Sequence, residues 1–352
     1  MHISEPNKII AQDIEAILLG KIQWDQFKNV SILITGADGF LASYLVKVLL
    51  HASMEFNLDL KIYAVVRSVI KSNRIKHLDG SEGLVLYEHD MSSPLPSDFP
   101  ITDWIIHAAS KASPKFYGSD PIGTFKPNSV GTLNLLEHAV INHSSKFLFI
   151  SSGEVYGEVD SGVTIDETAF GKLDTMKIRS AYGESKRMGE LLTAIWADQY
   201  NICGLVARPF HTYGPGLYLD DGRVFSDFVS NVVNKEPIVL NSDGKAERPF
   251  CYISDAVLGL LTILTSGSSG NAYNLGNPAG NISILDLAIM LSRLVDTNQV
   301  EVIRNHGDND NGGYLKSPIM QQDISIDKLR KLGWKPYITL QEGFRRMIMS
   351  YL

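Results

Sequence analysis

The side chains best suited to chemistry in this chain are a tyrosine and a lysine four positions apart, Tyr182 and Lys186. On a helix this spacing puts the phenol and the ammonium group on one face. A free tyrosine titrates at about 10 and a neighbouring cation favours its phenolate, so Tyr182 is a candidate proton acceptor. The same spacing also arises by chance in surface pairs, so further signals are needed.

One such signal lies upstream, where an apolar run ends in Ser151-Ser152-Gly153-Glu154. If the run is a strand, Ser152 and Glu154 bring a hydroxyl and a carboxylate to the carboxyl edge of a sheet, where open α/β folds bind ligands. The segment lacks the Gly-x-Ser-x-Gly elbow of α/β-hydrolases. The histidines form no H-E-x-x-H motif and no Cys/His cluster, so we expect no metal site.

A glycine-rich turn provides the strongest single signal. The apolar residues 32–34 lead into Gly36-Ala37-Asp38-Gly39-Phe40-Leu41-Ala42, which opens a helix. Without side chains at Gly36 and Gly39, the backbone can approach a pyrophosphate, whose charge the helix N-terminus stabilises. The alternative is a tight strand-to-helix turn without a ligand. We therefore predict a dinucleotide site here.

The end of the second strand leaves the nicotinamide cofactor open between NAD and NADP. A carboxylate at this point normally accepts the ribose hydroxyls of NAD, but the segment reads Ala64-Val65-Val66-Arg67-Ser68. Arg67 could instead bind a phosphate, together with Ser68, Lys71 or Arg74. Equally, Arg67 could stack on adenine or lie in solvent while NAD binds.

Short β-branched runs alternate with amphipathic helical stretches, which predicts helices on both faces of a parallel sheet. The expected fold is α/β, a Rossmann-like doubly wound parallel sheet with a smaller C-terminal substrate-binding domain. The predicted strands are 30–34, 61–66, 84–88, 104–107, 147–151 and 204–207, and the predicted helices are 41–51, 130–142 and 182–200.

The same pattern suggests a division of the chain. Residues 1–28 form an N-terminal arm that contains a possible amphipathic helix ending at Gly20. Residues 29–208, with about 250–266, are assigned to the dinucleotide-binding domain. Beyond Arg208 the regular alternation is lost and turns are frequent, so about 209–249 and 267–352 are assigned to the substrate-binding domain.

Composition limits the class of protein. The chain has 352 residues, of which 44% are apolar and 20% are charged, with a formal charge of −7. A folded protein without a nucleic-acid-binding surface is expected. No apolar stretch approaches the length of a membrane span and no signal peptide is evident, so a cytoplasmic location without membrane association is predicted.

These motifs, taken in order, resemble the extended short-chain dehydrogenase/reductases, in the group of NAD-dependent nucleotide-sugar epimerases, dehydratases and decarboxylases. The resemblance covers about residues 29–345 and is most similar to the UDP-glucuronate decarboxylases. The matching positions are the glycine turn, Asp90, His107-Ala108-Ala109-Ser110, Asn128 with Gly131-Thr132, the Ser152 segment, Tyr182 with Lys186, Arg208-Pro209 with Tyr213-Gly214-Pro215, Arg248 with Asp255, and Tyr273-Asn274-Leu275-Gly276.

The resemblance implies a role for each matching position. Tyr182 removes a proton from a sugar hydroxyl, Ser152 hydrogen-bonds the same oxygen, Lys186 holds the cofactor ribose, and Asp90 contacts its adenine part. Candidate cofactor-binding residues are Gly36, Gly39, Phe40, Leu41, Arg67, Asp90, Ala108, Ala109, Asn128, Tyr182 and Lys186. Candidate substrate-binding residues are Ser110, His211, Arg223 and Arg248.

Several alternatives stay open at these positions. Arg223 and Arg248 would clamp a nucleotide diphosphate, or each could form an exposed salt bridge. His211 stands where relatives usually have asparagine, so it is either a substrate contact or a packed, hydrogen-bonded ring.

Glu154 and its neighbour separate the reaction types. The family's 4,6-dehydratases have an Asp-Glu pair here, and Gly153 replaces the first carboxylate. The UDP-glucuronate decarboxylases retain the glutamate after a serine, and Gly153 departs from them too, because it lacks the hydroxyl. The sequence therefore favours a decarboxylase-like or 4-epimerase-like enzyme that oxidises C4 of a nucleotide-linked sugar.

Two further functions are kept as alternatives. One is an NADPH-dependent reductase of a keto nucleotide-sugar or nucleotide-polyol, and the other is an inactive dinucleotide-binding regulator. In addition, the helices at 130–142 and 188–200 carry apolar residues beyond one stripe. This suits either packing on the sheet or a homodimer formed by a helix bundle.

Overall fold

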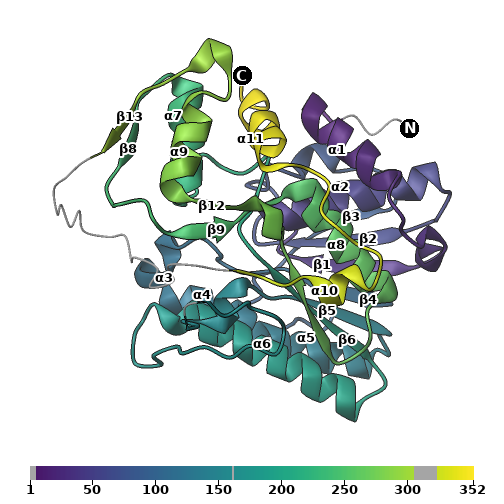
Figure 1. Ribbon diagram of the computed structural model, residues 1–352. Helices are drawn as coiled ribbons and strands as arrows, with labels where there is room; N and C mark the ends of the chain where they lie inside the picture. Colours follow the sequence, from purple (N-terminus) through teal and green to yellow (C-terminus); the bar gives the residue numbers. More distant parts are fainter. Residues whose placement is uncertain (1–4, 161, 305–322) are drawn as a thin grey trace.

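The computed structural model describes residues 5–160, 162–304 and 323–352, and its centre is a seven-stranded parallel sheet (Figure 1). The strand order is β11-β6-β5-β4-β1-β2-β3. The strands are β1 (Ser31–Thr35), β2 (Lys61–Val66), β3 (Leu84–Glu88), β4 (Trp104–His107), β5 (Lys146–Ile150), β6 (Cys203–Pro209) and β11 (Asn271–Leu275).

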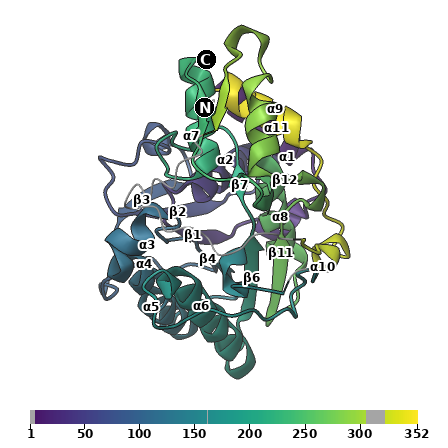
Figure 2. The same ribbon diagram turned by 60° about the vertical axis from the view of Figure 1, so that its left-hand side comes forward.

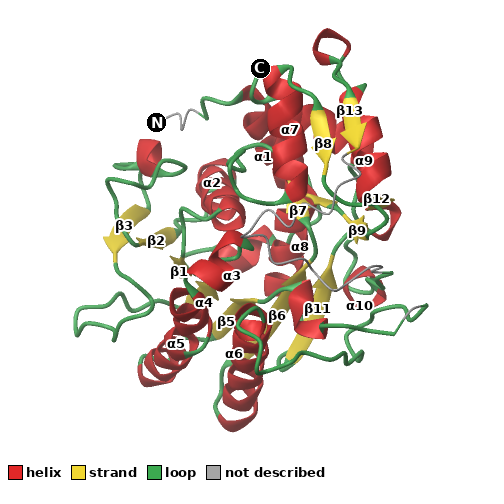
Figure 3. Cartoon of the chain, turned by 90° about the vertical axis from the view of Figure 1, so that its left-hand side faces the viewer, coloured by secondary structure: helices red, strands yellow, loops and turns green. Residues whose placement is uncertain are grey.

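Helices cover both faces of this sheet (Figure 3). One face carries α1 (Lys8–Leu18), α2 (Phe40–Glu55) and α8 (Ile253–Ser266), and the other carries α4 (Pro121–Asn128), α5 (Val130–Ile141) and α6 (Ser180–Gln199). Alternating strand residues supply the two cores. Ile32 and Ile34 of β1 belong to the cluster on the first face, whereas Leu33 packs in the other cluster with Leu135 and Leu136 of α5.

The chain reverses its direction of travel across the sheet at β1. It moves outward through β2 and β3, then returns to β4 on the other side of β1 and continues to β5, β6 and β11. The carboxyl ends of β1 and β4 are therefore the point where the strand order reverses, which is where open α/β sheets bind ligands. The predicted Rossmann-like doubly wound fold is confirmed, and the six predicted strands and three predicted helices are all present.

Smaller elements form a second cluster, at the opposite end of the molecule from α5 and α6 (Figure 2). Three two-stranded pairs occur here, β10 with β7, β12 with β9 and β13 with β8. The elements are β7 (Thr212–Tyr213), α7 (Val224–Asn234), β8 (Ile238–Leu240), β9 (Glu247–Pro249), β10 (Cys251–Tyr252), β12 (Asn281–Ser283), α9 (Ile284–Ser292), β13 (Val302–Arg304) and α11 (Leu340–Met349). Helices α3 (Lys115–Ser119) and α10 (Asp327–Arg330) lie nearer the main sheet.

The division into domains stays a prediction, with one structural fact to add. Strand β11 lies in the segment assigned to the substrate-binding part, yet it pairs with β6 in the main sheet. The expected N-terminal helix is present as α1, which packs against α2 and α8. Residues 1–4 of the arm and 305–322 of the C-terminal part lie outside the described residues.

In the described parts of the chain, no helix is both long enough and apolar enough to cross a membrane. Nor do three or more His, Cys, Asp or Glu side chains come together there as a possible metal site.

Candidate active site

The glycine turn lies at the point where the loops after β1 and β4 meet. Gly36 has a φ of 63°, and a Cβ atom there would lie 2.6 Å from the Cα of Ala109. Thr35 ties the two loops together, because its Oγ1 accepts hydrogen bonds from the amides of Ala108 and Ala109 at 3.2 Å each. Gly39 then caps the N-terminus of α2. Only glycine suits position 36, and the helix N-terminus that follows is a group that favours a phosphate.

Two of the buried polar atoms without a hydrogen-bond partner in the described chain belong to predicted site residues, Oγ of Ser110 and Oδ1 of Asn128. Asn128 is fully buried, and its Nδ2 donates to the carbonyl of Thr124 and to Ser185 Oγ at 2.9 and 3.0 Å. Buried polar atoms usually find a partner. The two unpaired atoms could therefore take hydrogen bonds from a polar ligand such as a dinucleotide.

The outer cofactor candidates lie at the ends of neighbouring elements. Phe40 and Leu41 are half-buried in the first turn of α2, whereas Arg67 and Asp90 are exposed beyond β2 and β3. Asp90 accepts a hydrogen bond from the amide of Ser92 at 2.9 Å. The structure thus places all four around one edge of the sheet, and their contacts with a cofactor stay predictions.

The proposed acid/base residues meet at the end of β5. Tyr182 and Lys186 lie on the sheet-facing side of α6 and are only 4% and 2% exposed. Lys186 Nζ donates to the carbonyl of Ile150 at 2.6 Å, which fixes α6 on the last residue of β5. Ser152 follows directly, and its hydroxyl is close enough to the Tyr182 phenol to lower the pKa of that phenol. Strand and helix therefore bring hydroxyl, phenol and amine together as the sequence predicted.

The electrostatics differ from the sequence expectation in one respect. Burial raises the pKa of Tyr182 to about 12, against the lowering effects of the Ser152 hydrogen bond and the charge of Arg223. Burial also lowers the pKa of Lys186 to about 7, which Glu190 opposes. Desolvation of the phenol therefore outweighs the groups that favour the phenolate, which include the cation of Arg223.

Two residues that the sequence analysis missed complete the surroundings of Tyr182. The ring of Tyr117, from α3, stacks on that of Tyr182 with centroids 4.7 Å apart and planes at 13°. Arg179 pairs with Glu154, with 3.2 Å between Nη1 and Oε2, and its guanidinium lies 5.8 Å from the Tyr117 ring centroid. Arg179 was detectable, because it precedes Tyr182 by one helical turn. Tyr117 carries no local signal.

Gly153 is packed against an aromatic ring. A Cβ atom at this position would lie 2.6 Å from both Cδ1 and Cε1 of Phe210. Phe210 is buried and stacks on Tyr156, with ring centroids 6.0 Å apart. The space of the carboxylate missing beside Glu154 is thus filled by a hydrocarbon ring.

The substrate candidates lie on three adjacent elements. Arg223 caps α7, is partly buried, and pairs with Asp221 at 3.0 Å through Nε. Arg248 lies in β9 and His211 immediately precedes β7, with a φ of 26°. Because β7 pairs with β10, His211 and Arg248 come to the same end of this pair. Of these candidates, Arg223 has a charge that acts on Tyr182.

With this geometry in view, the chain can be compared with known proteins. Residues 32–276 match the model of the NAD dependent epimerase/dehydratase family. UDP-glucuronic acid decarboxylase 2 of Arabidopsis thaliana is 33% identical over 324 residues, which cover 92% of this chain and 68% of that protein. UDP-glucuronic acid decarboxylase 1 of Xenopus tropicalis is 32% identical over 317 residues, covering 90% and 71%.

Solved structures agree on the fold. UDP-glucuronic acid 4-epimerase from Bacillus cereus, in complex with UDP-glucuronic acid and NAD, matches with a TM-score of 0.74 and 24% identity, covering 91% of this chain and 98% of that one. UDP-glucose 4-epimerase from Thermotoga maritima matches with a TM-score of 0.74 and 22% identity, with the same coverage of 91% and 98%. The chain belongs to the NAD dependent epimerase/dehydratase family.

Proposed function

We propose that this protein modifies a nucleotide-linked sugar through transient oxidation at C4 by bound NAD, and that the outcome is decarboxylation or 4-epimerisation. The observation that carries the proposal is the meeting of Ser152, Tyr182 and Lys186 at the end of β5. They lie at the carboxyl edge of the sheet, the edge that carries the Gly36 turn. The similarity to UDP-glucuronic acid decarboxylases supports a UDP-sugar acid as substrate.

The cofactor would be held by the residues around the Gly36 turn. We assign its pyrophosphate to Gly36 and Gly39, its adenine part to Asp90 and Arg67, and its ribose to Lys186. Phe40, Leu41, Ala108, Ala109 and Asn128 complete the proposed cofactor residues. When bound, NAD supplies a reversible hydride acceptor.

The chain's own residues would handle the proton and the carboxylate. Tyr182 takes the proton of the C4 hydroxyl while Ser152 holds the same oxygen. A carboxylate on C5 is then β to a C4 ketone. The bond between C5 and the carboxylate breaks, CO₂ leaves, and the electron pair stays on the sugar, where a proton later replaces it. Glu154, held by Arg179, is the acidic side chain assigned to these later steps.

The Gly153–Phe210 contact argues against 4,6-dehydration. That reaction uses both an acid and a base to expel water, and here one of the two positions faces a ring. For the substrate, we assign the diphosphate to Arg223 and Arg248 and sugar contacts to Ser110 and His211.

One experiment separates the outcomes. Native mass spectrometry of the purified chain identifies any retained cofactor, and incubation with UDP-, dTDP-, CDP- and GDP-sugars is followed by product NMR. We expect retained NAD and, from UDP-glucuronic acid, either a UDP-pentose with CO₂ or the C4 epimer. Stoichiometric loss of NADPH would instead indicate a reductase. If NAD is retained but no sugar gives a product, the result would indicate an inactive dinucleotide-binding regulator.

We also propose that the protein forms a homodimer through α4, α5 and α6. These helices expose apolar side chains at Ile122, Phe125, Val130, Met188, Leu191 and Ile195. An exposed apolar face of this kind is typical of an interface between subunits. The cytoplasmic location stays a prediction.

A further inference from the structure

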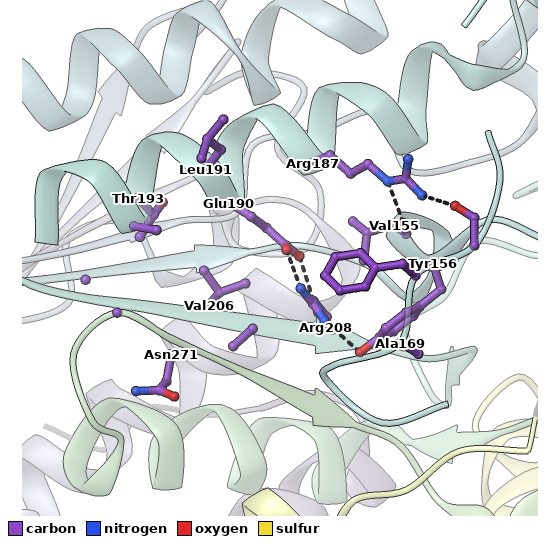
Figure 4. Close-up of a pocket in the computed structure, with 16 residues that line it drawn as sticks. Val155, Tyr156, Ala169, Arg187, Glu190, Leu191, Thr193, Val206, Arg208 and Asn271 are labelled. Carbon is purple, nitrogen blue, oxygen red and sulfur yellow. Dashed lines mark hydrogen bonds and ion pairs between the residues drawn. The ribbon is translucent and has the colours of Figure 1, made fainter. Parts of the chain in front are cut away.

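A charged pair lies behind the catalytic helix, outside the proposed active site. Glu190 of α6 and Arg208 of β6 meet in a pocket of about 410 Å³, between α6 and the strands β6 and β11 (Figure 4). Ser152, Tyr182 and Lys186 do not line this pocket. Glu190 therefore acts on the reaction only through other residues.

The pair is held in a fixed geometry. Arg208 donates from Nε and Nη2 to the two carboxylate oxygens of Glu190, at 2.9 and 2.6 Å. Its Nη1 donates to the hydroxyl of Tyr156 at 2.7 Å. The side chains of Glu190 and Arg208 are 13% and 14% exposed. Such a two-pronged, largely buried ion pair has a defined orientation, unlike an exposed salt bridge.

Glu190 and Lys186 hold consecutive residues of the same strand end. Lys186 binds the carbonyl of Ile150, and Glu190, one turn later on α6, accepts a hydrogen bond from the hydroxyl of Ser151. The next residue is Ser152. Two successive turns of one helix thus fix the position of the catalytic hydroxyl relative to Tyr182.

We propose that Glu190, clamped by Arg208, is a positioning residue that fixes Ser152 against α6 through the Ser151 hydroxyl and places a carboxylate one helical turn from Lys186. This proposal rests on the proposed function, which assigns catalytic roles to Ser152, Tyr182 and Lys186. Lys186 is buried, and the titratable groups around it are Tyr182 on α6, His107 on β4 and Glu190. Glu190 is the carboxylate that favours its charged form.

The two members of the pair should act on Lys186 with opposite signs. Replacing Glu190 by glutamine removes an anion and leaves Arg208 as an unpaired cation, so both changes lower the pKa of Lys186. Replacing Arg208 by glutamine leaves Glu190 as an unpaired anion, which raises the pKa of Lys186. A purely structural role would not produce opposite shifts.

The test measures Lys186 directly. Full-length protein carrying lysine labelled with ¹³C at Cε is titrated by NMR, and the Lys186 signal is assigned by its loss in Lys186→Arg. We expect the titration midpoint to fall by about one pH unit in Glu190→Gln and to rise by about as much in Arg208→Gln. Glu184→Gln is the control, because Glu184 also lies on α6 and pairs with an arginine, Arg187, but the pair is more exposed.

The outcomes separate this inference from the proposed function. An unchanged midpoint in Glu190→Gln, or shifts of the same sign in both variants, overturns the inference even if the wild type turns over a nucleotide sugar. Opposite shifts support it even if no substrate is found. Where a substrate is found, kcat of Glu190→Gln should fall about 10-fold or more at neutral pH with little change in KM, since the charged amine assists proton transfer.

Circular dichroism checks that each variant folds. If either single variant does not fold, the double variant Glu190→Met, Arg208→Met replaces both, because removing a buried pair as a whole leaves no unpaired charge. Its Lys186 midpoint should fall by about half a unit or more, since the nearer anion is lost. A midpoint equal to that of the wild type would reject the proposal.

Discussion

Tyr182 needs help to lose its proton, because burial raises the pKa of its phenol to about 12. Ser152 and Arg223 already favour the phenolate, and the positive nicotinamide ring would add to them. The proton-accepting form is therefore expected to develop when the cofactor is present. Coupling of this kind restricts proton removal to the loaded enzyme.

Tyr182→Phe should abolish most turnover while leaving the fold and the cofactor in place. We expect kcat to fall by about 10² to 10⁴, the usual contribution of a positioned general base. Native mass spectrometry should still detect the retained dinucleotide. Tyr200→Phe, at the exposed end of the same helix, is the control and should keep wild-type kcat. Turnover in Tyr182→Phe above half of the wild-type value would remove the acid/base role.

A substitution at Gly153 tests whether the Phe210 ring limits the size of the side chain beside Glu154. Gly153→Ser places a Cβ where the Phe210 ring lies, so the free energy of unfolding should fall by about 1 to 3 kcal/mol, as overpacking does. Phe210→Leu in the same chain makes room, and the two changes should couple by about 0.5 kcal/mol or more. Urea denaturation of the two single variants and the double variant measures this. Strict additivity would show that Phe210 does not limit position 153.

Among the secondary-structure elements, those with strong periodicity were predictable. The six strands inferred from apolar runs lie within about two residues of the observed ones, because buried parallel strands read as continuous β-branched segments. Strand β11 was missed as a strand, since Asn271 and Asn274 interrupt its apolar pattern. Tyr117 could not be found from the sequence, because its stack on Tyr182 depends on how α3 packs against α6.

Helix α1 does more than cover the sheet. Its Asp13 is fully buried and accepts hydrogen bonds from Tyr252 of β10 at 2.7 Å, Tyr44 of α2 at 3.2 Å and Arg346 of α11 at 2.7 Å. One carboxylate thus joins the first helix of the Rossmann part to the strand pair that carries His211. The N-terminal arm thereby fixes the substrate candidates relative to the sheet.

Asp13→Asn should therefore destabilise the chain. The amide leaves Arg346 without its buried counterion and satisfies fewer donors, so we expect a loss of roughly 1 to 3 kcal/mol in the free energy of unfolding. Glu15→Gln, on the exposed side of α1, should change it by less than about 0.5 kcal/mol. Urea denaturation compares the two. Equal losses would mean that α1 tolerates no change at all, rather than that Asp13 joins three elements.

Asp255, at the start of α8, links stability to pH. It is buried and accepts hydrogen bonds from the amides of Tyr337 and Ile338 at 3.0 Å each, and burial raises its pKa to about 6 from the ordinary value of 3.8. Because the folded pKa is the higher one, its contribution to stability is full below pH 3.8 and is lost as the pH rises through about 6.

The matched variant isolates this contribution. Between pH 5 and pH 7.5 the wild type should lose about 1 kcal/mol of stability through Asp255. Asp255→Asn does not titrate, so the difference in unfolding free energy between the wild type and the variant should change by this amount, with the wild type favoured at the lower pH. Urea denaturation at the two pH values measures the difference. A difference that does not change with pH would contradict the raised pKa.

For the molecule as a whole, the two helical faces differ in what they leave exposed. The face with α2 and α8 is covered in part by α1, whereas α4, α5 and α6 keep apolar side chains on their outer surface. Leu191 is 62% exposed although it lies in the middle of α6. Since α6 also carries Tyr182 and Lys186, a partner subunit packed on this surface would stiffen the helix that positions the chemistry.

Leu191→Glu tests the dimer. A charge at the centre of the proposed interface costs desolvation that no partner offsets, so the affinity between subunits should fall by about 100-fold or more. Light scattering at micromolar concentration should give twice the 38.9 kDa of one chain for the wild type and a single chain for the variant. Ile289→Glu, on the exposed surface of α9 at the other end of the molecule, should leave the dimer intact. A wild type that scatters as a monomer, or dissociation by Ile289→Glu but not by Leu191→Glu, would place any interface elsewhere.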